Sequence, residues 1–347
     1  MIASFLLPSL GLGSVDDTVV SHNIIRNTRE GINVQAGDVL GAPTTGTLTN
    51  TQIIDNTVSD NLFTGIQLFT NGVPGSSIDK TVISRNQVTQ NPTTGIALLT
   101  TTTILPLGSK TAITQTTITD NTVTQNGTGI NIFPFKGSTY TITDSLIARN
   151  TLSQNTLAIA VLGGFQASNN TVSALIENNT ISKNTNAGAS TGILVEGGLN
   201  SSSGNHLNVI VSKNTLKNNT GHAITVVGGQ QNSSNNTDNV VEVSNNLIED
   251  SESDGILALG GFEFGTAQPT DTSSGNAVNL TVNKNTVRRS GRNGISLSAG
   301  GSTTGTPANN SAEGSSRADQ EDVESGLQPV FHLEAWNLLK VSAIPRE

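Results

Sequence analysis

One asparagine recurs along the chain in a nearly constant setting, and this setting limits the folds available to the chain. An aliphatic residue stands three positions before it and another two positions after it, in nine copies spaced 29 to 39 residues apart. Self-similarity at such a period is typical of solenoids, in which each unit buries its apolar side against its neighbours. The anchor asparagines are Asn23, Asn56, Asn86, Asn121, Asn150, Asn179, Asn214, Asn246 and Asn285.

Each copy continues with apolar residues at every second position, such as Ile130 and Ile132. Period two indicates a strand with one buried face, and no part of the repeat shows a helical period. Each unit therefore reads as strand, asparagine bend, short strand, turn, strand and loop. A glycine precedes the last strand in six copies, and we expect it to supply a turn with positive φ: Gly65, Gly95, Gly129, Gly192, Gly255 and Gly294.

The anchor asparagine lies between two inward aliphatic residues, which predicts that it occupies a corner of each coil. Asparagine tolerates the left-handed conformation that a sharp bend requires. Its amide can also donate to and accept from the asparagine of the next coil, so that buried corners satisfy one another in a ladder. A weaker column five residues later is expected to serve the next corner: Asn61, Asn91, Asn126, Asn155, Asn184, Asn219, Ser251 and Ser290.

This pattern resembles the parallel β-helix repeat of the right-handed, pectin-lyase-like superfamily, and more narrowly the repeat of NosD-type proteins. A competing interpretation, the leucine-rich repeat, fits "VIVSKNTL" but requires leucine five residues before the anchor, where Thr18, Thr51 and Thr81 stand. We therefore predict an all-β chain that forms a single-stranded right-handed parallel β-helix of about nine coils. The resemblance is specific for the fold but does not specify the activity, because many unrelated functions share this scaffold.

The predicted organisation has four parts. Residues 1–14 form an N-terminal edge or truncated start, 15–301 the β-helix, 302–328 a polar acidic linker, and 329–347 a candidate amphipathic capping helix. The last segment has Phe331, Leu333, Trp336 and Leu339 at roughly helical spacing. The open end of a solenoid exposes unpaired backbone groups, and an amphipathic helix is one way to cover them.

Composition excludes several classes of partner. The net charge of −9 disfavours nucleic acid and anionic membranes, since both require a basic face. The absence of cysteine excludes disulfides and thiolate metal sites. No run of 18 apolar residues exists, which argues against membrane insertion. The first residues lack the positively charged region of a secretory signal, although the resemblance implies a secreted, periplasmic or cell-surface protein of a bacterium.

Charged residues are most informative when they are compared between coils. The residues just before the anchors alternate in sign, from Asp55 and Arg85 to Asp120 and Arg149, which predicts an exposed stripe of ion pairs. The densest charges lie in the last coils, where they form either a structural ladder or a catalytic site. The candidate catalytic residues are Glu249, Asp250, Asp254, Arg288, Arg289 and Arg292.

The resemblance indicates what such a catalytic site would do. In β-helix lyases, acidic residues hold calcium against a uronate while an arginine or lysine takes the α-proton. Calcium is therefore expected only if the protein is a lyase or epimerase of acidic polysaccharide, and otherwise no cofactor is expected. The Arg-x-Lys of polygalacturonase-like hydrolases is missing, and four scattered histidines with a single methionine do not support a copper site.

Two groups of apolar residues point to binding instead. A column predicted to face outward consists of Phe69, Leu99, Phe133, Leu162, Val227 and Leu259, which either lies under loops or forms a groove. Phe69, Phe133, Phe135 and Tyr140 are candidates for stacking on sugar rings. The favoured function is an extracytoplasmic scaffold that contacts polysaccharide or a surface protein without catalysis. The alternative is the lyase or epimerase.

Overall fold

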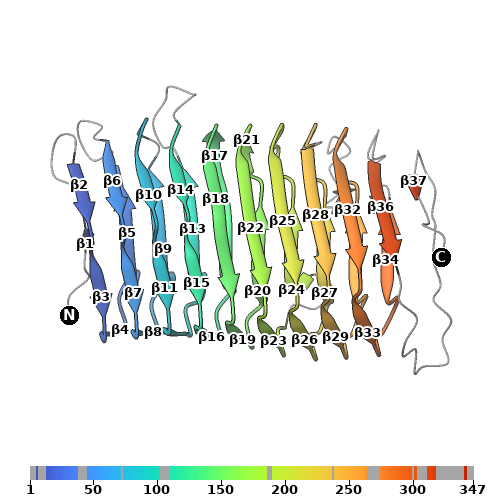
Figure 1. Ribbon diagram of the computed structural model, residues 1–347, viewed down its shortest axis with the longest axis horizontal. Helices are drawn as coiled ribbons and strands as arrows, with labels where there is room; N and C mark the ends of the chain where they lie inside the picture. Colours follow the sequence, from blue (N-terminus) through green and yellow to red (C-terminus); the bar gives the residue numbers. More distant parts are fainter. Residues whose placement is uncertain are drawn as a thin grey trace.

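The protein is a rod of stacked coils built from three large parallel β-sheets, and the coils follow one another along the rod in sequence order (Figure 1). The computed structural model describes residues 5–6, 13–37, 45–71, 73–101, 110–185, 190–236, 238–263, 274–298, 301–302, 311–317 and 340–341. No helix occurs in these ranges. The predicted all-β parallel β-helix is confirmed, and the smallest of the three large sheets contains nine strands, one from each anchored repeat.

Each coil passes through the three sheets in the same order. We call the three sheets A, B and C; they have 11, 15 and 9 strands. In each coil the chain runs from sheet B through the corner at the anchor asparagine to sheet C, and then through a second corner to sheet A. Sheet C contains β4 (Ile24–Arg26), β8 (Thr57–Ser59), β12 (Gln87–Thr89), β16 (Thr122–Thr124), β19 (Thr151–Ser153), β23 (Thr180–Ser182), β26 (Thr215–Lys217), β29 (Leu247–Glu249) and β33 (Thr286–Arg288). Sheet A contains β1 (Phe5–Leu6), β5 (Ile32–Ala36), β9 (Thr64–Asn71), β13 (Thr94–Thr101), β17 (Thr128–Ser138), β20 (Leu157–Leu162), β21 (Phe165–Ser168), β24 (Ser190–Glu196), β27 (His222–Val227), β30 (Ile256–Leu259) and β34 (Ile295–Ser298).

Sheet B is the largest of the three sheets. Its strands are β2 (Gly13–Asp16), β3 (Val19–Ser21), β6 (Gly46–Thr49), β7 (Gln52–Ile54), β10 (Ser77–Asp79), β11 (Val82–Ser84), β14 (Ala112–Thr114), β15 (Thr117–Thr119), β18 (Thr141–Ala148), β22 (Thr171–Glu177), β25 (His206–Ser212), β28 (Asp238–Ser244), β32 (Ala277–Asn283), β36 (Ser311–Arg317) and β37 (Lys340–Val341). A separate two-stranded pair joins β31 (Phe262–Glu263) to β35 (Gly301–Ser302).

The core is a continuous column of aliphatic side chains enclosed by the three sheets. In the coil of Asn86, for example, Ile83 points inward from sheet B, Val88 from sheet C and Ile96 from sheet A, and all three are fully buried. Parallel pairing in register places each on the equivalent residue of the next coil. Burial of such a side chain stabilises a fold by about 1.5–3 kcal/mol, so the repeated aliphatic columns explain why the coils stack.

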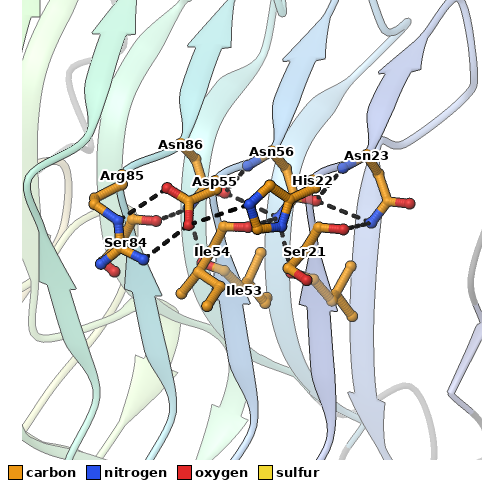
Figure 2. A network of polar contacts seen from close by, with 11 residues as sticks. Ser21, His22, Asn23, Ile53, Ile54, Asp55, Asn56, Ser84, Arg85 and Asn86 are labelled. Carbon is orange, nitrogen blue, oxygen red and sulfur yellow. Dashed lines mark hydrogen bonds and ion pairs between the residues drawn. The ribbon is translucent and has the colours of Figure 1, made fainter.

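The predicted asparagine ladder is present along the rod. The backbone N–H and Nδ2 of Asn56 both donate to Oδ1 of Asn86, at 2.9 and 3.0 Å, and Nδ2 of Asn56 also donates to the carbonyl oxygen of Val20 (Figure 2). The two bonds to the next anchor recur at every anchor from Asn23 to Asn246. The second column forms a ladder of the same kind from Asn61 to Asn219, as predicted.

The left-handed residue of the corner is not the anchor, and the prediction on this point is wrong. The residue just before each anchor has φ between 54° and 59°, as in Asp55, Arg85 and Lys213, whereas the anchors are absent from the positive-φ residues. The backbone N–H of the anchor donates to the next anchor in the ladder, and the preceding residue adopts the left-handed conformation that turns the chain. Its side chain points into solvent, which explains why charged residues occupy that column.

The glycines before the sheet A strands also have another role than the predicted one. Gly65 and Gly95 do not have positive φ. A Cβ built on Gly95 would lie 2.6 Å from the carbonyl oxygen of Gly129 and 2.7 Å from Cγ1 of Val123, both in the next coil. Glycine is therefore required here because neighbouring coils approach too closely for a side chain.

Substitution of Gly95 with alanine tests this explanation. We expect Gly95→Ala to lower the free energy of unfolding by about 1–3 kcal/mol, because overpacking must push two coils apart. Gly294→Ala is the matched control in the same column, since a Cβ on Gly294 has its nearest contact at 3.9 Å and fits without displacement. Urea unfolding followed by circular dichroism measures both. Equal losses in the two variants would show that close approach is not the reason for glycine.

The ends of the rod were predicted less well. Within the predicted linker 302–328, Ser311–Arg317 forms β36 and pairs in register with β32, so the sheet continues beyond Gly301. The candidate capping helix 329–347 lies outside the described residues, apart from β37, which pairs with β36. Of the predicted N-terminal edge 1–14, the described residues are Phe5–Leu6, which pair with β5, and Gly13–Ser14 in β2.

Candidate functional site

The predicted ion-pair stripe runs along the anchor corners. Arg85 binds Asp55 through two bonds, Nε to Oδ1 at 2.9 Å and the terminal nitrogen to Oδ2 at 2.8 Å, and His22 lies 3.9 Å from the same carboxylate (Figure 2). Arg149 holds Asp120 in the same way. The hydrogen bond from Arg85 lowers the pKa of Asp55, so this carboxylate stays ionised at neutral pH. These exposed pairs fix the register of neighbouring coils and do not converge on a common point.

The charges of the last coils also pair from coil to coil. Glu249 in β29 lies 2.6 Å from Lys217 Nζ in the coil before it, and 3.8 and 3.7 Å from Arg288 and Arg289 in the coil after it. The hydrogen bond from Lys217 is the largest cause of the lowered pKa of Glu249. Asp250 forms a two-bond pair with Arg289, at 2.6 and 2.9 Å. Glu249 and Asp250 are therefore both matched by bases in the neighbouring coils.

The other two candidate residues lie apart from this ladder. Asp254 stands just before β30, at the start of a sheet A strand, whereas Glu249 belongs to sheet C. Arg292 is exposed and forms no ion pair with any of the candidate acids. The six residues predicted as one catalytic cluster thus separate into a paired ladder, a buried aspartate and an exposed arginine.

Asp254 is the centre of a buried polar contact that includes a residue missed in the sequence. His222 of the preceding coil places Nδ1 3.0 Å from Oδ2 of Asp254, and Asn293 of the following coil donates from its backbone N–H and Nδ2 to Oδ1, at 2.9 and 3.0 Å. Burial by itself raises the pKa of Asp254, but the bonds from His222 and Asn293 outweigh it and the pKa is lowered. The three residues occupy one column, in which earlier coils have Thr64 and Thr94, so comparison of coils reveals them.

Three phenylalanines form an aromatic cluster on sheet A. The rings of Phe133 and Phe135 meet edge to face with centroids 5.9 Å apart, and Phe135 stacks on Phe165 of the next coil at 5.3 Å. All three side chains are half-buried, and Lys136 Nζ lies 5.2 Å from the centroid of Phe135. Phe165 was not predicted, although it is paired in register with Phe135. We name Phe133, Phe135 and Phe165 the Phe135 cluster.

The remaining predicted binding residues have different surroundings. Tyr140 is 1% exposed, and its hydroxyl donates to the carbonyl oxygen of Lys136 at 2.9 Å, so it cannot stack on an external ligand and serves the packing of β17 and β18. Phe69 is half-buried in β9 and separated from the cluster by Leu99, with which both Phe69 and Phe133 are in register.

The predicted outward column is present but contains an acid. Leu162 pairs with Glu196, Glu196 with Val227, and Val227 with Leu259. Leu162 and Val227 are buried, whereas Phe69, Leu99, Phe133 and Leu259 are half-buried. Glu196 was overlooked in the sequence because the column was recognised by its apolar members. Burial raises its pKa to about 8.

Among the described residues, no three of the His, Asp and Glu side chains gather into a group that could hold a metal ion. Within the same part of the chain, no helix is long and apolar enough to span a bilayer.

Comparison with known proteins identifies the repeat. The family model described as the right handed beta helix region matches residues 49–263, which include seven of the nine anchors, from Asn56 to Asn246. No curated protein sequence matches the chain.

Three solved structures show a distant likeness. Similar to this chain are DFA-IIIase from Arthrobacter chlorophenolicus A6 without its lid (12% identity, TM-score 0.33, 94% of this chain and 68% of that chain) and the A-module of the mannuronan C-5 epimerase AlgE6 from Azotobacter vinelandii (11%, 0.33, 97% and 91%). The Streptococcus pneumoniae surface protein and adhesin PfbA is also similar (10%, 0.19, 83% and 90%). At these TM-scores the likenesses do not extend to function.

Proposed function

The chain belongs to the right-handed β-helix family, and from this premise we propose that it is a non-catalytic scaffold that binds glycans outside the cytoplasm. The proposal rests above all on the charges of the last coils. A catalytic lyase site needs ionisable groups that converge on a substrate, whereas Glu249 and Asp250 are matched by Lys217, Arg288 and Arg289 along the rod. Such pairing supports a structural role for the densest charge in the molecule.

The Phe135 cluster is the proposed contact with the glycan. Half-buried aromatic rings present flat apolar surfaces, and the C–H faces of sugar rings pack on such surfaces. Phe135 stacks on Phe165 with ring planes 26° apart, so the two rings form one apolar platform across two coils that a sugar ring can contact along its exposed side. Lys136 beside this platform favours a glycan that has carboxylate groups.

Binding assays with the Phe135 cluster test this function. We expect the protein to bind an acidic polysaccharide such as alginate or polygalacturonate without turnover, and Phe135→Ala to weaken binding about tenfold, which corresponds to about 1.4 kcal/mol. Phe63→Ala is the matched control, because Phe63 is an exposed phenylalanine that contacts Arg29 in an early coil. Isothermal titration calorimetry measures both variants. Equal weakening in the two variants, or none in Phe135→Ala, would contradict the proposed platform.

The enzymatic alternative is favoured by one observation, the contact between Asp254 and His222. A buried aspartate that holds one nitrogen of a histidine fixes the tautomer and orientation of the imidazole, as general bases require. A lyase or epimerase of acidic polysaccharide would then use His222 rather than Glu249 and Asp250.

Turnover assays separate the scaffold from the enzyme. The chain is incubated with acidic and neutral polysaccharides, with and without calcium, and uronate double bonds and epimer ratios are measured. We expect no turnover in the parent. Turnover that Asp254→Asn abolishes and the double variant Glu249→Gln/Asp250→Asn retains would establish the enzymatic alternative at His222. Turnover lost in the double variant would instead restore the charged ladder as the site.

A further inference from the structure

Glu196 ends β24 and points out of sheet A, yet it is buried. Ile193 and Val195 of the same strand point into the core, so the alternation of a strand directs Glu196 to the outer face. Its side chain is nevertheless only 1% exposed. Glutamate is rarely buried in this way unless a partner compensates its charge.

The surroundings of Glu196 are apolar in both directions along the rod. Leu162 of the preceding coil and Val227 of the following coil are its partners in register, and both are buried. The strands packed against it, β20 and β27, contain one ionisable residue, His222, which stands at the far end of β27. The sequence has no other ionisable residue in 157–176, 197–205 and 223–237, which include the turns that follow β20, β24 and β27.

Within the described part of the chain, one oxygen of the carboxyl group is buried without a polar partner. Oε1 of Glu196 is buried without a hydrogen-bond partner among the described residues, and the same is true of Oγ1 of Thr225, which lies opposite Leu194 two positions earlier. A carboxylate without a donor is strongly disfavoured in an apolar site, whereas a neutral carboxylic acid is tolerated. The protonated form therefore matches the observed packing.

We infer that Glu196 is a proton-dependent latch, which holds the end of β24 against its neighbours while it is protonated and releases it when the proton is lost to solvent. Two hydrogen bonds at this point hold the strand end. Gly163 N–H donates to the carbonyl oxygen of Glu196, and Gly197 N–H donates to the carbonyl oxygen of Val227, both at 2.8 Å. To hydrate its charge, the carboxylate must swing outward, and this movement disrupts both bonds. The inference concerns sheet A itself and is independent of the proposed glycan binding.

Hydrogen exchange tests the latch directly. Protection of peptides that cover residues 190–199 is measured by mass spectrometry from pH 6 to pH 9, relative to an unstructured peptide at the same pH. Because burial raises the pKa to about 8, we expect protection to fall about tenfold per pH unit from pH 6 to pH 8 and to level off towards pH 9. Peptides from sheet C, such as those covering Thr122–Thr124, should show no such change.

Variants identify the group that titrates. Glu196→Gln should keep its protection to pH 9, and Glu196→Leu, which continues the column of Leu162 and Leu259, serves the same purpose if the glutamine variant fails to fold. Glu242→Gln on β28 is the control and should behave as the parent. A parent without loss of protection between pH 7 and pH 9, or the same loss in Glu196→Gln or Glu196→Leu, would overturn the inference.

Discussion

Replacing Asn150 with alanine is expected to lower the free energy of unfolding by about 4 kcal/mol. Asn150 is 1% exposed and lies in the middle of the anchor ladder. Its Oδ1 accepts from the backbone N–H and Nδ2 of Asn121, both at 3.0 Å, and its Nδ2 donates to the carbonyl oxygen of Ile118 at 2.8 Å. Removal leaves two donors and one acceptor buried without partners, each at a cost of about 1–3 kcal/mol.

An exposed asparagine provides the control for this experiment. Asn208 lies on the outer side of β25 and is exposed, so Asn208→Ala should change the free energy of unfolding by less than about 0.5 kcal/mol. Urea unfolding followed by far-ultraviolet circular dichroism measures both variants. If Asn150→Ala were as stable as Asn208→Ala, water would have to satisfy the three orphaned groups, and the ladder would not be a source of stability.

The ladder also shows what the sequence could predict. Side chains that repeat once per coil lie on top of one another. The anchor column, the second asparagine column and the aliphatic columns could therefore be predicted from the repeat period and the residue spacing. The residue with positive φ at each corner could not be predicted in this way. Asparagine is the residue most tolerant of positive φ, yet Arg85 and Lys213 adopt it, because the ladder occupies the asparagine and the outward residue has free space.

A third ladder escaped the sequence analysis although it has a signal. Asn170, Asn205 and Asn236 donate in turn to the next coil, ending at Asn276. Each is preceded by serine and then by asparagine or glycine, as in "SNN" at 168–170 and "SGN" at 203–205. The earlier coils lack this phrase, so a search for columns shared by all repeats passes over it.

Candidate sites are harder to predict from the sequence than the fold, for a physical reason. Whether a charge is structural or functional depends on whether its partner lies in the neighbouring coil or across a groove, and spacing along the chain does not distinguish the two. Two functional candidates stand out when equivalent positions of successive coils are compared. Asp254 and Glu196 each stand where other coils have threonine or an apolar residue, and both prove to be buried.

Glu196 gives the second large effect, a fall in stability as the pH rises. Burial raises its pKa to about 8 in the folded protein, against an ordinary value of 4.5. The folded state therefore binds more protons than the unfolded state between these two values, so stability decreases as pH increases in this window. Below pH 4.5 this group has no effect on the pH dependence, and above pH 8 the loss is complete.

The size of this effect follows from the shift. Each pH unit in the window lowers the free energy of unfolding by about 1.4 kcal/mol, which adds up to roughly 5 kcal/mol between pH 4.5 and pH 8. Glu196→Gln has no proton to lose, so its stability should lack this slope, and the variant should be more stable than the parent at pH 8. Glu242→Gln should keep the parental slope. The measurement is urea unfolding of the three proteins at four pH values from 5 to 8.

Comparison of this slope with the hydrogen-exchange profile separates two mechanisms of release. If the end of β24 opens while the rest of the rod stays folded, the carboxylate reaches water in the native state and the slope falls below 1.4 kcal/mol per pH unit at the pH where exchange begins. If no local opening exists, the full slope continues to pH 8 and exchange of residues 190–199 follows global unfolding. Parallel slopes for the parent and Glu196→Gln would show instead that the carboxyl group titrates in the folded rod as it does in the unfolded chain, and that its burial does not control stability.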